Sequence, residues 1–323
     1  MTKLAGDGGP AKRSALVGSR SIVQRQLEPE LVELQKAMAV AHRRVQIIAS
    51  VRTVVSVVLA ALALVVVVVG RGATIISVLG LAGMLILAAL VTPWIRLMLR
   101  RAVVIQETFD SELFGLPWNE GLAGQRIPTA EVHALSRALR SGGKRERYIL
   151  AGWYDDTGDI ASPMDVLVCQ EQNLGWDLRL RVRYVLFLGS AVAVWLTLGI
   201  GLGFGRHLLV DELLLTWFVP SLPAFVLALE LMVNQIEIYS ERKRLLSALV
   251  RVVGAQANCT IDAARRAELW RFARQIQDGV FATRVLGPRV PYMLYRLFRS
   301  KDEEDYQVQT TARHAAAGTE GTS

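Results

Sequence analysis

Cysteine and histidine are scarce in this sequence, which limits the chemistry it can perform. The 323 residues include two cysteines, Cys169 and Cys259, and four widely separated histidines. No pair of His, Cys or acidic residues has the short spacing typical of zinc ligands. We therefore expect no metal and no cofactor. Both thiols fall in blocks that are assigned below to the cytoplasm, so they are expected to be reduced and unpaired.

Catalytic motifs are also missing. The chain has no GxSxG sequence, no P-loop with its lysine and no kinase signature. Four alternating glycines superficially suggest a phosphate loop, but they end an apolar run instead of linking a strand to a helix. These glycines are Gly199, Gly201, Gly203 and Gly205. We interpret them as sites of close helix packing and a flexible exit from the bilayer, and we expect no enzymatic activity.

Charge is absent from four stretches, apart from one acid, and these stretches are long enough to cross a membrane. A hydrocarbon core about 30 Å thick needs roughly 20 helical residues. The stretches are residues 53–70, 72–95, 184–205 and 213–233, the last of which holds Glu230. The first stretch begins about 50 residues into the chain and another follows at once, which argues against a signal peptide.

The four stretches form two hairpins, because only Arg71 with its neighbours separates the first pair and residues 206–212 separate the second. Short connections make the paired spans antiparallel, so the three longer blocks share one side of the membrane. These blocks hold 35 of the 37 Lys and Arg residues. By the positive-inside rule they are cytoplasmic, which predicts a multi-pass protein of the plasma membrane with both termini in the cytoplasm.

The predicted fold is all-α, with two transmembrane hairpins and a mainly helical cytoplasmic portion. Apolar residues recur at helical spacing after Pro29, and again between residues 266 and 284. The expected order is a disordered N-terminus (1–20), a cytoplasmic helix leading into the first span (21–52), hairpin one (53–97), a cytoplasmic helical region (98–183), hairpin two (184–233), C-terminal cytoplasmic helices (234–301) and a disordered tail (302–323).

The net charge of +8 suggests partners only weakly. Basic segments beside a bilayer are attracted to anionic head groups, so the lipid bilayer itself is the expected partner. The topology alone explains the basic excess, and we expect no binding of DNA or RNA.

Polar groups inside the fourth span suggest a pore or gate. Glu230 lies one turn before Asn234, and Pro220 and Pro223 favour a kink in the same helix. An acid in this position should face protein or water. Two interpretations remain open: a water-lined path or gate, and an interfacial acid that pairs with a neighbouring arginine or reaches the head-group zone.

Aromatic and polar residues in the cytoplasmic blocks are candidates for a ligand or regulatory site. Aromatic rings stack on bases, while Arg and amide groups contact phosphates and base edges. The same residues would serve equally well in packing helices against the membrane part. The candidates are Trp118, Asn119, Trp153, Tyr154, Gln170, Asn173, Trp176, Arg179, Gln275 and Asp278.

An ordered set of short motifs resembles the S-4TM family. The motifs are residues 106–110 (QETFD), 116–119 (LPWN), 153–154 (WY), 169–170 (CQ) with Asn173 and 176–177 (WD), and 274–278 (RQIQD) followed by Arg284, Pro288, Val290, Pro291 and Tyr295. The resemblance runs from about residue 27 to 299. It implies a four-span, pore-forming effector of the bacterial inner membrane, associated with a nucleotidyltransferase in CBASS antiphage signalling.

On that resemblance, the partner enzyme would make a cyclic oligonucleotide on infection, and the effector would breach the membrane in abortive infection. Four spans are too few to enclose a wide aqueous hole, so we expect a homo-oligomer. Two alternatives remain: a small ion or solute transporter, and a membrane-anchored scaffold without pore activity. A transporter would want broken helices in both halves, and the sequence shows such a signal only in the fourth span.

Overall fold

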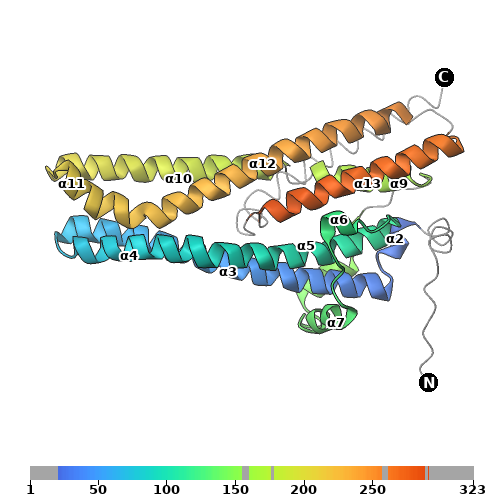
Figure 1. Cartoon of the computed structure of the whole chain (residues 1–323), viewed down its shortest axis with the longest axis horizontal. Helices are drawn as coiled ribbons and strands as arrows, with labels where there is room; N and C mark the ends of the chain where they lie inside the picture. The colour runs from blue at the N-terminus through green and yellow to red at the C-terminus, as the bar shows by residue number, and fades with distance from the viewer. Residues whose placement is uncertain (1–20, 155–159, 176–177, 257–260, 288–289, 291–323) are drawn as a thin grey trace.

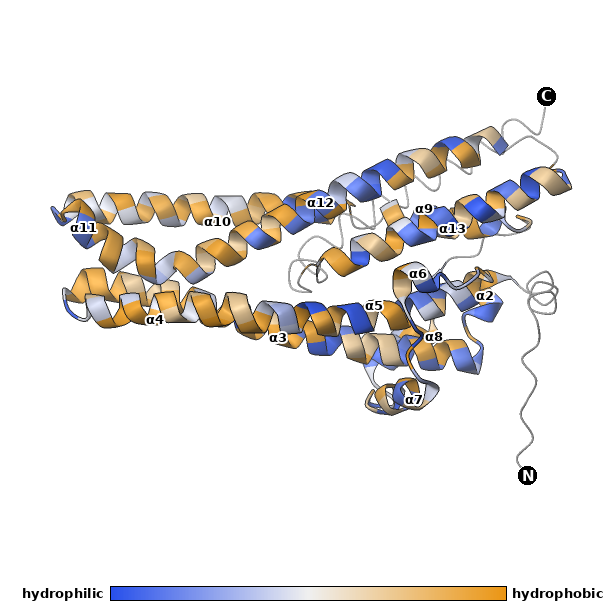
Figure 2. Cartoon of the chain, viewed as in Figure 1, coloured by the Kyte–Doolittle hydropathy of each residue, from blue (hydrophilic) through white to orange (hydrophobic). Residues whose placement is uncertain are grey.

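The computed structural model describes residues 21–154, 160–175, 178–256, 261–287 and 290, and every regular element in these ranges is helical. Four helical runs are long and apolar enough to cross a membrane. They form two antiparallel pairs that lie side by side, with the short connections at one end (Figure 1) and the more hydrophilic segments at the other (Figure 2). The predicted all-α, four-span architecture is confirmed.

The first hairpin joins α3 (Pro29–Val69) to a composite helix made of α4 (Ala73–Ile86), the π-helix η1 (Leu87–Val91) and α5 (Thr92–Phe114). The expected helix start at Pro29 is present, and a proline suits a first turn because its missing N–H has no partner there anyway. The turn between the spans has left-handed backbone at Gly70 (φ 72°) and Gly72 (φ 85°), which only glycine adopts without strain.

The second hairpin joins α10 (Leu178–Gly205) to α11 (Val210–Leu213), the π-helix η2 (Leu214–Phe218) and α12 (Val219–Gln256). The apolar halves of both hairpins lie together, and the charged halves continue the same helices beyond them (Figure 2). Many large apolar side chains on the apolar halves are exposed, such as Val194 and Phe204. Soluble proteins avoid exposed apolar surface of this extent, so these faces contact lipid and the chain is a multi-pass membrane protein.

Each π-helix ends two residues before a proline. Pro93 and Pro220 lack an N–H, so a carbonyl four residues earlier loses its donor and the helix widens by one residue. In η1 the Thr92 N–H donates to the Leu87 carbonyl, and in η2 the Val219 N–H donates to the Leu214 carbonyl. The expectation that only the fourth span is interrupted was therefore wrong.

The two hairpins make close contact through small residues. A Cβ added to Gly80 on α4 would lie 2.6 Å from Pro220 Cα, and the Ser77 hydroxyl donates to the Leu215 carbonyl. Trp217 of η2 is fully buried and stacks on Trp195 of α10 with ring centroids 4.6 Å apart. Small residues such as glycine let the backbones of two helices approach closely, and such contacts hold membrane spans together in lipid.

Gly199→Ala is expected to destabilise hairpin two by about 1–3 kcal/mol through overpacking. A Cβ at this position would lie 2.2 Å from Trp217 Nε1, so the stacked indole would have to move. Thermal unfolding in detergent would measure the effect. Gly201→Ala is the matched control, because nothing lies within 4 Å of its Cβ position. Equal unfolding temperatures for the two variants would contradict close packing of Trp217 on Gly199.

The charged end is a second packed unit. It contains α2 (Ile22–Arg25), the first half of α3, the second halves of α5 and α12, and α6 (Glu120–Ala123), α7 (Thr129–Arg137), α8 (Lys144–Leu150), α9 (Met164–Gly175) and α13 (Ala263–Leu286). Its core is apolar, and one cluster includes Leu34, Met38, Phe109, Leu113, Phe114, Leu167 and Leu269. Because α3, α5 and α12 run unbroken from this unit into the apolar part, a displacement in either part acts directly on the other.

Candidate functional site

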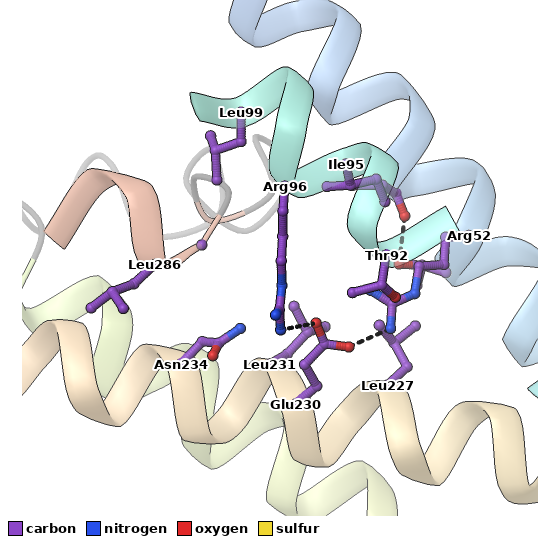
Figure 3. A pocket seen from close by; sticks show the side chains of 13 residues that line it. Arg52, Thr92, Ile95, Arg96, Leu99, Leu227, Glu230, Leu231, Asn234 and Leu286 are labelled. Atoms are coloured by element: carbon purple, nitrogen blue, oxygen red, sulfur yellow. Dashed lines mark hydrogen bonds and ion pairs between the residues drawn. The ribbon is translucent and has the colours of Figure 1, made fainter. Parts of the chain in front are cut away.

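A charged cluster joins the two hairpins where their apolar parts end. Glu230 of α12 accepts from Arg52 of α3 through one carboxylate oxygen, and from Arg96 of α5 through the other at 3.4 Å (Figure 3). The Arg52 side chain is 8% exposed, whereas that of Arg96 is 64% exposed. One carboxylate of hairpin two therefore bridges two guanidinium groups of hairpin one.

This cluster lines a cavity between the hairpins. Its other walls are mainly apolar and include Leu99, Leu227 and Leu286, and the Asn234 side chain also lies on its wall (Figure 3). The Arg52 Nε is buried without a hydrogen-bond partner in the described part of the chain. Arg52 thus holds its place chiefly through Glu230, so losing that carboxylate would leave a buried cation without compensation.

Among the four gate candidates, only Glu230 and Asn234 line this cavity. Pro220 and Pro223 lie earlier in α12, where Pro220 packs against Gly80 near the short connections. Figure 1 shows the chain changing direction between η2 and α12, as the two prolines would favour. The prolines shape the helix there, and the charged cluster lies at the opposite end of the apolar part.

A second polar cluster is buried in the charged unit, between α5 and α13. Glu107 accepts from Arg274 at 2.7 Å and from Gln277 at 2.8 Å. Asp110 accepts from Gln277 at 3.1 Å and from Arg284. Both residues are only 2% exposed as a whole. Two acids of α5 thus face two arginines and an amide of α13, and each charge has a partner, as buried charges require.

Electrostatics in this second cluster follow its burial. Removal from water raises the pKa of Glu107, and the neighbouring Arg274 opposes this shift. Burial also raises the pKa of Tyr154 well above its ordinary value, and the nearby charge of Asp110 adds to the shift. Burial lowers the pKa of Arg284, but Asp110 together with the nearby Tyr154 and Glu107 outweighs this effect, so the pKa is raised. The described residues contain no group of three His, Cys, Asp or Glu that could hold a metal.

Comparison with known proteins identifies the family. The model of the SMODS-associating 4TM effector domain matches residues 20–313. The chain belongs to this family. This 4TM effector is also 24% identical over 292 residues to a probable CBASS effector molecule of Bacillus cereus (strain VD146), an alignment that covers 88% of the chain and 95% of that relative. No solved structure is significantly similar to the effector.

Three of the sequence-predicted ligand candidates join the second cluster of the 4TM effector. Asn119 donates to Asp278 at 3.0 Å, and Asp278 also pairs with Arg274. The Gln170 amide donates to the Ala273 carbonyl at 3.0 Å and to Gln277 at 3.2 Å. These residues join the loop after α5, helix α9 and helix α13.

The remaining candidates lie elsewhere in the effector. The Trp118 indole donates to the Gly124 carbonyl at 2.9 Å. Tyr154 is buried and its hydroxyl accepts from Asn173 at 3.2 Å, while Trp153 remains 38% exposed. Gln275 and Arg179 are exposed on α13 and α10. Trp176 and Cys259 lie outside the described residues, and Cys169 is buried and forms no disulfide with a described residue.

Sequence reasoning named none of the residues with the densest polar contacts as site candidates, although five of them lie in the family motifs. These residues are Arg52, Arg96, Glu107, Asp110, Arg274, Gln277 and Arg284. A local signal existed for part of this set. Glu107, Asp110 and Ser111 recur at helical spacing, as do Arg274, Gln277 and Asp278, within helices that are otherwise apolar on that face. Polar stripes of this kind on otherwise apolar faces indicate helices that pair with each other.

Proposed function

We propose that this 4TM effector acts in a CBASS-type antiphage system, where a cyclic oligonucleotide made by a partner nucleotidyltransferase causes it to open the inner membrane. The family membership supports an effector role, and the relative's description supports the CBASS setting. On this proposal the charged unit and both termini are cytoplasmic, where a soluble nucleotide can reach them. Membrane opening in an infected cell would then lead to abortive infection.

The observation that carries the mechanism is the Glu230 cluster between the hairpins. Four spans in one chain leave no wide aqueous path. The pore therefore requires a homo-oligomer, or a separation of the two hairpins within a chain of that oligomer. The residues of this cluster lie on α3, α5 and α12, and all three helices continue into the charged unit. A ligand that binds the open arrangement more tightly would break the interhairpin ion pairs through these helices. On this proposal the effector opens by a conformational change and catalyses no reaction.

Reconstitution tests this function directly. Purified effector in liposomes that contain a self-quenched dye is expected to release the dye when a cyclic oligonucleotide is added or when the neighbouring nucleotidyltransferase and its nucleoside triphosphates are present. Release should be negligible without them. The proposal fails if a panel of cyclic di- and trinucleotides and the partner enzyme all leave the liposomes intact. If the spans form the pore, replacing them with an unrelated anchor should abolish toxicity, whereas a scaffold would keep its activity.

A transporter is the second candidate, and the two π-helices are the observation in its favour. Interrupted helices in both halves occur in transporters that bind substrate at matched depths. In this effector the depths differ: η2 begins four residues after the start of α11, whereas η1 begins 14 residues after the start of α4. Both spans start at the short connections, so the interruptions lie at different levels. Ion-coupled solute uptake into liposomes would favour the transporter.

A further inference from the structure

A cleft in the charged unit, far along α3 from the Glu230 cluster, has the chemistry of a nucleobase site. It lies between the first turns of α3, the helix α8 and the turn after α8. Its lining includes Gln35, Met38, Arg145, Tyr148 and Trp153. The cavity volume is about 60 Å³, so the cleft accepts the edge of one base at its open mouth and is too small for a whole cyclic oligonucleotide.

An unpaired amide lies in the wall of this cleft. Gln35 is 3% exposed, and its Nε2 has no hydrogen-bond partner within the described structure. A buried donor without a partner is unfavourable and calls for an explanation. The terminal torsion of a glutamine is soft, so the amide can turn toward a ring nitrogen or exocyclic oxygen of a base. A base in the cleft would supply the acceptor that the protein does not.

The aromatic edge of the cleft is held in place by the backbone. Tyr148 and Trp153 are 48% and 38% exposed, and their rings meet edge to face with centroids 6.4 Å apart. The buried Gln26 accepts from the N–H groups of Trp153 and Tyr154 and donates to the Tyr154 carbonyl. Gly152, at φ 92°, makes the turn that brings this segment to Gln26. An indole held in this way provides a stacking face at low entropic cost.

The charge around the cleft suits the phosphates of a nucleotide. Helix α8 carries exposed Lys144, Arg145 and Arg147 and a single acid, Glu146. That acid is paired with Lys36 of α3. An anionic backbone that leaves the cleft would therefore pass a surface of net positive charge.

We propose that this cleft binds one base of the activating cyclic oligonucleotide, stacked on Trp153 and read by the Gln35 amide, with the phosphates toward α8. The inference rests on the proposed function and deepens it by naming the ligand site. It also supplies a route to the membrane. Gln35 and Arg52 lie on the same unbroken helix, about 25 Å apart at 1.5 Å per residue. Because α3 has no break between these residues, a shift of its first turns relative to α8 also displaces Arg52 in the interhairpin ion pair.

Binding to the full chain in detergent tests the site, with radiolabelled 3′,3′-cyclic dinucleotides and cyclic trinucleotides as probes in equilibrium dialysis. Trp153→Ala is expected to weaken binding by about tenfold or more, because it removes a stacking face. Trp153→Phe keeps an aromatic ring and should remain within about threefold of the wild type. Gln35→Leu should weaken binding by about fivefold. It should not lower the unfolding temperature, because it removes an unpaired buried donor.

Gln125→Leu, at an exposed glutamine between α6 and α7, is the matched control and should bind like the wild type. If a probe binds the wild type and both Trp153→Ala and Gln35→Leu bind it equally well, the cleft is not the site, and the proposed function stands. If no probe binds but co-expression with the nucleotidyltransferase still permeabilises cells, the base site is overturned alone. Absence of both binding and permeabilisation overturns the proposed function and this inference with it.

Discussion

Glu230→Gln is expected to make the effector leak without its trigger. The substitution keeps the shape of the side chain and removes the carboxylate charge that compensates Arg52, whose side chain is 8% exposed. Removing one partner of a buried ion pair costs about 3–5 kcal/mol. Because the Glu230 side chain is 21% exposed, we expect about 2 kcal/mol at this site after discounting for solvent screening. This cost falls on the closed arrangement, where the hairpins meet.

A cost of this size is large for a gate. About 2 kcal/mol changes an equilibrium constant about thirtyfold, which would raise an open fraction of about 1% to about a quarter. Dye release from liposomes without nucleotide should therefore rise at least tenfold, and uninduced expression should become toxic. The measurement is the initial rate of dye release at equal amounts of reconstituted protein.

Glu237→Gln provides the matched control, since this exposed acid lies on the same helix two turns further on. It should remain as tight as the wild type. Arg52→Gln combined with Glu230→Gln should leak less than Glu230→Gln alone, because the uncompensated cation is gone. Liposomes that stay tight with Glu230→Gln would show that these ion pairs do not hold the closed state.

The spans could be predicted from the sequence because their signal is local. Absence of charge over about 20 residues marks each one, and the structure contains a long apolar helix at all four positions. The helix start at Pro29 was equally local, because a proline marks a first turn. The interruption at η1 went unnoticed, although Pro93 is the same kind of signal as Pro220. A proline in an apolar run shows that one backbone N–H is missing, but it does not show whether the helix kinks or forms a π-helix there.

The site was less predictable because its pairs are distant in the chain. Glu230 and Arg52 are 178 residues apart, and Asp110 and Arg284 are 174 apart. A single sequence shows which residues carry charge, but only packing decides which of them meet. Aromatic residues drew attention instead, and the structure gives Trp118 a local backbone partner while leaving Trp153 open to solvent. The polar stripes on α5 and α13 were each readable, but spacing alone did not show that Asp110 would meet Arg284.

Asp110→Leu is expected to destabilise the charged unit severely. Arg284 is buried with Asp110 as its ion-pair partner, and the two side chains are 7% and 3% exposed. Leucine would leave the guanidinium in the protein interior facing apolar atoms, at a cost of about 3–5 kcal/mol. Gln277 would lose one of its two acceptors on α5 as well. The apparent unfolding temperature in detergent should fall by roughly 10 °C, and the response to the trigger should be lost as α13 separates from α5.

The Asp110–Arg284 pair joins α5 to α13. A double substitution distinguishes the loss of this ion pair from a general intolerance of mutation at the site. Asp110→Leu with Arg284→Met replaces both charges by apolar groups of similar size, which is often neutral or stabilising for buried pairs. The double variant should therefore recover most of the lost unfolding temperature. Glu268→Gln, at the exposed pair with Arg265 on the same helix, should change it little. If the double variant is as unstable as Asp110→Leu alone, the loss came from the shape of the site rather than from the unpaired Arg284. If it recovers stability but stays unresponsive, the charges of α5 and α13 take part in transmitting the signal to the hairpins.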